Sequence, residues 1–126
     1  MDWRHFTRDE FACSHCGENE ISTALIDWLD MVRHAADIGP VVVTSGYRCA
    51  AHDKAIGGAG VHPTGLAVDV RPAEGWSRAA ILLRTAYRWN VSGVGIKGHG
   101  DHASRFLHFD LLDTLDKRPW LWTYPR

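Results

Sequence analysis

The 126-residue sequence lacks several features that mark common functional classes. It has no run of lysine or arginine and a formal net charge of −1, which argues against binding to nucleic acid or to an anionic membrane surface. No apolar stretch approaches the roughly 20 residues that a helix needs to cross a membrane. The N-terminus, from Met1 to His5, lacks the apolar core of a signal peptide, so we expect a chain that is made in the cytoplasm.

Cysteine is scarce, and the odd number of three argues against a disulfide framework in a chain without a signal peptide. Cys13 and Cys16 form a C-x-x-C pair, and Cys49 precedes His52 at the same offset. Together they are compatible with a closed structural zinc site, because such sites use cysteine and histidine at short spacings. The alternative is that Cys13 and Cys16 are reduced thiols near the start of the fold, and the sequence leaves both interpretations open.

Repeats, low-complexity tracts and linkers are also absent, which predicts a single domain over residues 1–126. Hydrophobic residues make up 45% of the chain, enough for a buried core at this length. We expect this domain to act as a monomer.

The hydrophobic periodicity predicts an α+β fold. Helices are expected from Ser22, a good N-cap, to the Ile38-Gly39-Pro40 stop, over a short stretch at 49–56, and from residue 76 or 77 to about 89. The aromatic tail at 118–124 is expected to pack on the edge of the domain. The order of the elements is typical of a small, mostly antiparallel sheet with helices packed on it, and its strands are expected at 41–44, 66–70, 93–96 and 105–111.

Histidine is unusually frequent, with eight residues, and one of them lies just before a strand that carries an aspartate. In the stretch VHPTGLAVDV, His62 precedes a buried strand with Asp69, a carboxylate that is unfavourable to bury alone. In the last predicted strand, alternation places His108 and Asp110 on one face and apolar residues on the other. If the two strands are neighbours with these faces aligned, Asp69 and His108 converge, and His62 reaches them from the preceding loop.

Two imidazoles and one carboxylate provide three zinc ligands and leave a fourth position for water, which is the open arrangement of a catalytic zinc site. We therefore predict one catalytic Zn²⁺ ion held by His62, Asp69 and His108. Asp110 is predicted to hold the His108 ring through its other nitrogen. For each residue taken alone the alternative is structural: Asp69 is paired with an arginine, His108 is satisfied inside the core, and Asp110 meets solvent or an arginine.

Four motifs, in this order and spacing, resemble the zinc D-Ala-D-Ala carboxypeptidase family: Ser45-Gly46-Tyr47-Arg48 followed by His52, Gly57-Gly58, His62 to Asp69 with Gly65 and Ala67 between them, and Phe106-Leu107-His108-Phe109-Asp110. The resemblance runs from about Phe6 to Trp122 and implies the fold shared with lysostaphin-type peptidases and the Hedgehog signalling domain. By motif, His62, Asp69 and His108 take the ligand positions. Arg48 matches an arginine expected to bind substrate through a carboxylate or the polarised carbonyl, with Tyr47 and Ser45 of the same motif at the substrate.

The resemblance implies a zinc peptidase that cuts stem or cross-link peptides of peptidoglycan, as a D,D-carboxypeptidase or a murein endopeptidase. A short domain without a signal peptide is similar to a phage or prophage endolysin, which acts on the cell wall after release or delivery. Because so small a domain has few loops to close its cleft, endopeptidase activity is favoured. The alternative is a non-catalytic, zinc-stabilised binding or structural module, such as a phage tail component.

The general base is not given by the motif, because many relatives carry an acid three residues before the last histidine ligand and this chain has Arg105 there. The loop that leads into this strand contains His102 and Asp101, and we predict one of them as the base that takes the proton of the attacking water. Arg48 or a nearby imidazolium is predicted to stabilise the developing oxyanion. Alanine variants of His102 and Asp101 are expected to keep zinc, and at least one to lower turnover on the order of a hundredfold. The alternative for this loop is a solvated surface turn.

Overall fold

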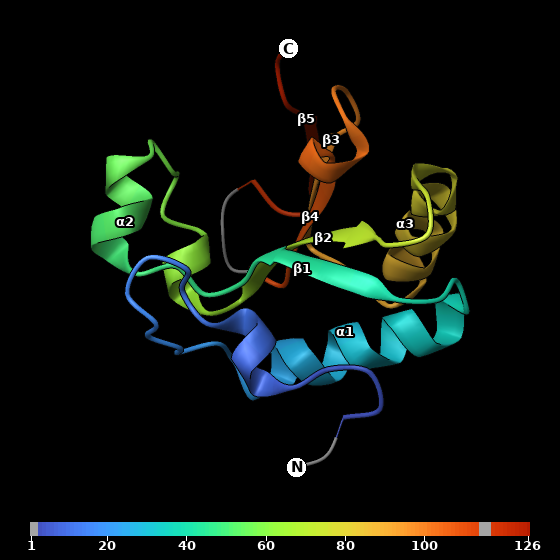
Figure 1. The fold of residues 1–126 in the computed structure, drawn as a ribbon, viewed down its shortest axis with the longest axis horizontal. Coiled ribbons are helices and arrows are strands. Elements are labelled where there is room, and N and C mark those ends of the chain that lie inside the picture. The colour runs from blue at the N-terminus through green and yellow to red at the C-terminus, as the bar shows by residue number, and fades with distance from the viewer. Residues whose placement is uncertain (1–2, 114–116) are drawn as a thin grey trace.

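A computed structural model describes residues 3–113 and 117–126 (Figure 1). The predicted α+β class is confirmed, with a five-stranded sheet in the order β1-β2-β4-β3-β5. The strands are β1 (Val41–Ser45), β2 (Ala67–Pro72), β3 (Gly93–Lys97), β4 (Phe106–Asp110) and β5 (Trp120–Thr123).

The sheet is mixed rather than mostly antiparallel, because the edge strand β5 runs parallel to its neighbour β3. The pairs β1–β2, β2–β4 and β3–β4 are antiparallel, whereas β5 runs parallel to β3. The sequence predicted that the aromatic tail packs on the edge of the domain. Its residues 120–123 lie at that edge, but they form a strand that is hydrogen-bonded to β3. The alternation of tryptophan with leucine and threonine suits this half-exposed strand.

The three predicted helices are present as α1 (Thr23–Ala36), α2 (Ala50–Ala55) and α3 (Ala79–Arg88). Ser22 is the N-cap of α1, as predicted, and Asp37 ends that helix in the left-handed conformation. Single 3-10 turns occur at Arg8–Phe11, His62–Thr64, Trp76–Arg78 and His102–Ser104. Within the described ranges, no helix combines the length and the apolar character that a membrane crossing requires.

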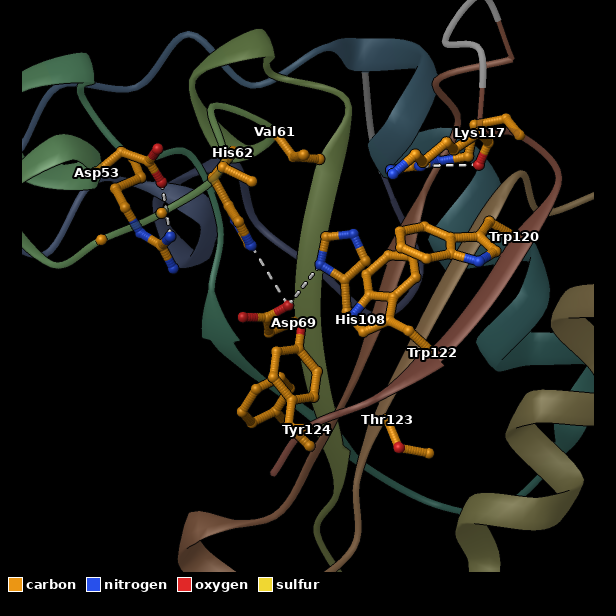
Figure 2. A pocket seen from close by; sticks show the side chains of 16 residues that line it. Asp53, Val61, His62, Asp69, His108, Lys117, Trp120, Trp122, Thr123 and Tyr124 are labelled. Carbon is orange, nitrogen blue, oxygen red and sulfur yellow. Dashed lines mark hydrogen bonds and ion pairs between the residues drawn. The ribbon is translucent and has the colours of Figure 1, made fainter. Parts of the chain in front are cut away.

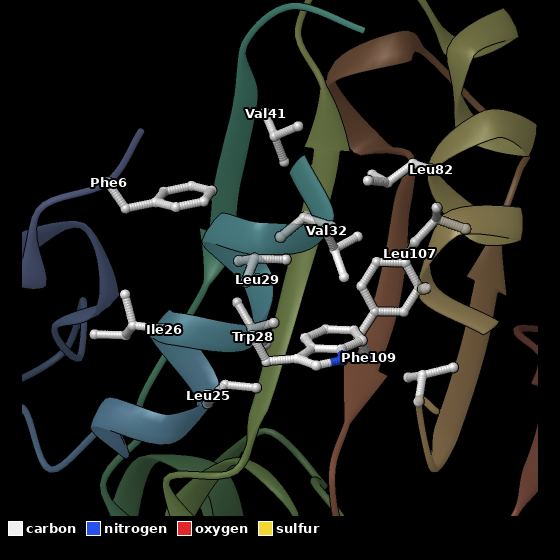
Figure 3. Packing of buried hydrophobic residues seen from close by; sticks show 14 of the residues in the cluster. Phe6, Leu25, Ile26, Trp28, Leu29, Val32, Val41, Leu82, Leu107 and Phe109 are labelled. Carbon is white, nitrogen blue, oxygen red and sulfur yellow. The ribbon is translucent and has the colours of Figure 1, made fainter. Parts of the chain in front are cut away.

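The hydrophobic core lies between α1, α3 and one face of the sheet (Figure 3). Trp28 of α1 meets Phe109 of β4 edge to face, with ring centroids 5.7 Å apart, and its indole N–H donates to the Trp89 carbonyl. Leu107 and Leu82 are buried in the same cluster. Burying each such side chain contributes about 1.5–3 kcal/mol, so this face of β4 is firmly fixed. The other face of β4 is therefore presented to the opposite side of the sheet.

Candidate metal centre and active site

The strand register aligns the two polar faces as the alternation predicted. Asp69 of β2 lies directly opposite His108 of β4, and Ala67 lies opposite Asp110. On the other side of β4, Gly95 and Gly93 of β3 lie opposite these two polar residues. A Cβ atom at Gly93 would collide with the Asp110 carboxylate and the Arg118 side chain, and one at Gly95 with the Trp122 indole. The glycines of β3 thus leave room for the groups that surround His108.

His62, Asp69 and His108 meet at one point, and their candidate ligand atoms all lie within 4.8 Å of one another (Figure 2). His108 Nδ1 is 3.0 Å and His62 Nε2 is 3.4 Å from Asp69 Oδ1. All three side chains are buried. The 3-10 turn after Val61 brings His62 over β2, and the left-handed Gly65 ends that turn and returns the chain to the strand.

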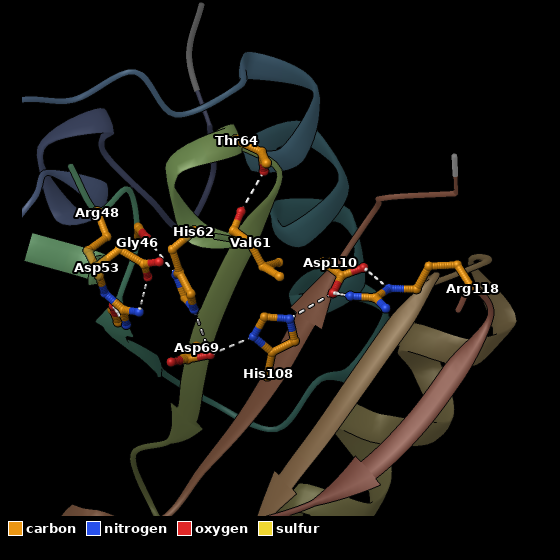
Figure 4. Close-up of polar contacts among 11 residues, drawn as sticks. Gly46, Arg48, Asp53, Val61, His62, Thr64, Asp69, His108, Asp110 and Arg118 are labelled. Atoms are coloured by element: carbon orange, nitrogen blue, oxygen red, sulfur yellow. Dashed lines mark hydrogen bonds and ion pairs between the residues drawn. The ribbon is translucent and has the colours of Figure 1, made fainter. Parts of the chain in front are cut away.

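Both imidazoles are held from behind by hydrogen bonds, as Figure 4 shows. His62 Nδ1 donates to the Gly46 carbonyl at 2.9 Å, which leaves Nε2 as the nitrogen that faces Asp69. His108 Nε2 lies 2.8 Å from Asp110 Oδ2, which leaves Nδ1 facing Asp69. Such outer partners fix the ring orientation of metal-binding histidines. The donor set of two nitrogens and one carboxylate oxygen therefore fits a zinc ion.

The Asp110 carboxylate is fully buried, and Arg118 neutralises it with two hydrogen bonds. Arg118 Nε donates to Oδ1 at 2.9 Å and Nη2 to Oδ2 at 2.8 Å. Burial alone raises the pKa of Asp110, but hydrogen bonds with His108 and Arg118 lower it to about 2. Burial likewise raises the pKa of Asp69, whereas hydrogen bonds with His108 and His62 lower it to about 2. Both carboxylates are therefore ionised at neutral pH.

Replacing Asp110 with asparagine should weaken zinc binding about ten- to a hundredfold, because the His108 ring loses the carboxylate that orients it and raises its basicity. Competition with a chromogenic chelator measures this affinity. Arg118→Met serves as the partner variant, since it leaves the Asp110 carboxylate in place and removes only its counter-charge. Unchanged zinc affinity in Asp110→Asn would contradict the orienting role.

Zinc affinity should also fall as the pH drops, beginning above the ordinary titration range of histidine. Burial alone lowers the pKa of His108, but hydrogen bonds with Asp110 and Asp69 raise it above the usual 6.5. A protonated imidazole cannot bind metal, so apparent affinity should fall about tenfold for each pH unit below that pKa. Chelator competition across about pH 5 to 9 tests this, and in Asp110→Asn the decline should begin at a lower pH. A flat profile in the unmodified protein would contradict it.

The three residues line a cleft with a volume of about 860 Å³ (Figure 2). One wall is formed by the aromatic side chains of Trp120, Trp122 and Tyr124, from β5 and the residue after it. The Trp122 ring lies 5.0 Å from the His108 ring, centroid to centroid. Small residues, Gly57, Gly58 and Ala59, also line the cleft. The aromatic wall was not predicted as part of the site, although the tryptophan-rich tail is a signal of it in the sequence.

Arg48 reaches the cleft, whereas the other two residues predicted at the substrate do not line it. Arg48 Nη1 donates to Asp53 Oδ1 at 2.8 Å, and Nη2 donates to Ser45 Oγ at 2.9 Å. Asp53 is itself buried and accepts a hydrogen bond from the Gly60 N–H. Ser45 thus positions Arg48, while Tyr47 is buried in the hydrophobic cluster.

Asp101 and His102, predicted as candidates for the general base, are not among the residues that line the cleft. Their loop is held at the far end of the strands by side-chain donors to its carbonyls. Arg71 donates to the Ala103 carbonyl at 3.0 Å, and Lys97 donates to the Ser104 carbonyl at 2.8 Å. These contacts anchor the 3-10 turn that leads into β4.

A sequence profile of the family described as Peptidase M15 matches residues 4–110. A comparison with curated proteins finds no match. The matched region contains Arg48, His62, Asp69 and His108, and it stops before β5 and the aromatic wall.

Proposed function

We propose that this chain, which belongs to the peptidase M15 family, is a zinc-dependent peptidase that hydrolyses peptide bonds in peptidoglycan. The observation that carries the proposal is the convergence of His62, Asp69 and His108 in a cleft that also contains Arg48. A satisfied core histidine does not explain this arrangement, because both imidazoles present a nitrogen to the same carboxylate oxygen.

His62, Asp69 and His108 would hold the ion, with Gly46 and Asp110 behind the two imidazoles. Zinc bound there supplies Lewis-acid chemistry, since it polarises a peptide carbonyl and makes water acidic enough to attack near neutral pH. Arg48 donates from the side of the cleft to the oxygen on which negative charge develops. Tyr124 is a second candidate donor. Burial raises the pKa of its phenol, so this group stays protonated at neutral pH.

The walls of the cleft favour an endopeptidase over a carboxypeptidase. A carboxypeptidase needs groups that recognise the terminal carboxylate, whereas the lining residues Gly57, Gly58 and Ala59 have no polar side chain to offer it. The aromatic wall offers apolar surface to a chain that continues past the cleaved bond. Cations at Arg48 and Lys117 suit the carboxylates of stem peptides. We propose action at the cell wall, after release or delivery of an enzyme made in the cytoplasm, as in a phage or prophage lysin.

The second candidate is a non-catalytic, zinc-stabilised binding or structural module, such as a phage tail component. The observation that favours it is the base: Arg105 occupies the position where the family resemblance predicts an acid, and Asp101 and His102 do not line the cleft.

Digestion of purified murein, followed by mass spectrometry of the muropeptides, distinguishes the two candidates. The peptidase should release new peptide ends, lose this activity with a chelator and regain it with zinc. Cleavage inside cross-links would identify an endopeptidase, and loss of a terminal D-alanine a carboxypeptidase. A folded, zinc-binding protein that cleaves no murein peptide would leave only the structural module.

The position of the loop before β4 changes the expectation for its two candidate bases. Alanine at Asp101 or His102 should keep zinc and leave turnover within about threefold of the unmodified protein, because neither side chain lines the cleft. Initial rates on murein or on a cross-linked peptide measure this. A hundredfold loss in either variant, at unchanged zinc content, would restore that residue as the base.

A further inference from the structure

A second group of metal-binding side chains lies outside the cleft, at Cys13, Cys16 and Cys49. Their sulfur atoms lie within 4.8 Å of one another, and all three are free thiols. Cys13 and Cys16 belong to the N-terminal segment, whereas Cys49 is the N-cap residue of α2. The group thus joins two parts of the chain that are distant in the sequence.

The backbone around Cys13 is arranged to stabilise a thiolate. The segment from Cys13 to Gly17 forms a tight turn, in which the Gly17 N–H donates to the Cys13 carbonyl at 2.8 Å and Gly17 has a φ of +78°. The Cys49 N–H donates to Cys13 Sγ at 3.4 Å. A backbone N–H directed at a sulfur atom favours the thiolate form.

The three sulfurs also act on one another, because they all lie within 4.8 Å of one another. Three sulfurs this close cannot all carry negative charge in the absence of a positive ion. A divalent cation among them removes that repulsion and holds all three as thiolates.

Two imidazoles stand beside the sulfurs. His15 Nδ1 lies 3.8 Å from Cys49 Sγ, and the His15 and His52 rings stack in parallel with centroids 4.8 Å apart. His52 lies in α2, three residues after the N-cap residue Cys49. The contact with Cys49 makes His15 the nearer of the two rings to the sulfurs, and His52 is held beside it by the stacking.

We propose that Cys13, Cys16 and Cys49 bind a second, structural zinc ion, and that one imidazole of the His15–His52 pair completes a closed site. The C-x-x-C spacing within a tight turn, joined to ligands at the start of a helix, matches the needs of tetrahedral zinc. A disulfide would leave one of the three sulfurs unpaired, whereas a zinc ion uses them all. This proposal does not rest on the peptidase activity.

The ion would tie the N-terminal segment to the loop that serves the cleft. The Tyr47 N–H already donates to the Phe11 carbonyl at 2.7 Å in this region. Gly46, whose carbonyl orients His62, approaches Phe11 so closely that a Cβ atom would collide with its backbone. Zinc at the thiolates would therefore support Gly46 and Arg48 from outside the cleft.

Metal analysis of the full chain, purified with zinc and reductant, tests the proposal. The unmodified protein should contain about two zinc ions per chain, and Cys49→Ser and His108→Ala about one each. Cobalt substitution identifies the ligands, because only the cysteine site gives a thiolate-to-cobalt charge-transfer band. That band should persist in His108→Ala and disappear in Cys49→Ser. If Cys49→Ser does not fold, the zinc content and cobalt spectrum of the unmodified protein and of His108→Ala still decide.

The proposal would be overturned by a single zinc ion per chain with no thiolate band, or by a disulfide between two of the cysteines in the reduced preparation. His15→Ala and His52→Ala test the fourth ligand. Weaker zinc binding at the cysteine site in one of them supports a closed site, and unchanged binding in both contradicts it. Murein cleavage is not needed for any of these measurements, so failure of the proposed function would leave them intact.

Discussion

Replacing Asp69 with alanine should remove zinc from the cleft and lower peptidase turnover with it, on the order of a thousandfold or more, because bound metal contributes several kcal/mol of transition-state stabilisation. Asp69 is the one carboxylate among the three predicted ligands, and both His62 and His108 are directed at its Oδ1 atom. Without it, two neutral imidazoles remain, and they bind zinc much less tightly. Zinc content and murein cleavage, measured on the same preparation, check the result.

The matched control for this variant is Asp9→Ala, which removes an exposed aspartate from the 3-10 turn near the N-terminus. It should keep both zinc and activity. Because the cysteine site is expected to retain its own ion, the diagnostic change in Asp69→Ala is the loss of about one zinc per chain. Full zinc content together with full activity in Asp69→Ala would refute the assignment of the metal centre.

Replacing Arg48 with alanine should lower kcat/KM about a hundred- to a thousandfold while zinc stays bound, because the transition state loses a donor aimed at its developing charge. Asp53 and Ser45 fix the guanidinium by hydrogen bonds, so the Arg48 side chain is already in position before the reaction begins. Steady-state kinetics on a cross-linked peptide, with zinc content measured in parallel, separate this effect from metal loss.

Two controls distinguish catalysis from stability at Arg48. Removing the arginine leaves the buried Asp53 carboxylate with only the Gly60 N–H, and breaking such a pair costs about 3–5 kcal/mol. Arg48→Ala combined with Asp53→Asn relieves that penalty and should remain as impaired as the single variant. Arg84→Ala, on the exposed side of α3, should be unaffected. Recovery of activity in the double variant would show that Arg48 acts only through stability.

The part of the site that could be predicted from the sequence depends on local periodicity. Residues two apart on a strand share a face, so the pairing of His108 with Asp110 followed from alternation alone. The opposition of Asp69 and His108 required only that β2 and β4 be neighbours, and they are. Helix α1 was predicted from local signals too, namely the N-cap Ser22, the stop at Gly39 and the apolar stripe between them. The helix lies where these signals placed it.

The parts that could not be predicted depend on contacts between distant segments. Nothing in the sequence around Arg118 indicates that it neutralises Asp110, because the pairing exists only when β5 folds beside β3. The loop with Asp101 and His102 has the composition of an active-site loop, but its place is decided by Arg71 and Lys97. Composition alone does not reveal such anchors.

The last strand, β5, contributes residues to the cleft but lies outside the region that the family profile matches. The match to the family ends at residue 110, the last residue of β4, so a fragment cut there would retain His62, Asp69 and His108. It would also strip the indole cover from His108 and leave Asp110 without its guanidinium. The region matched by the family and the complete candidate site therefore have different borders.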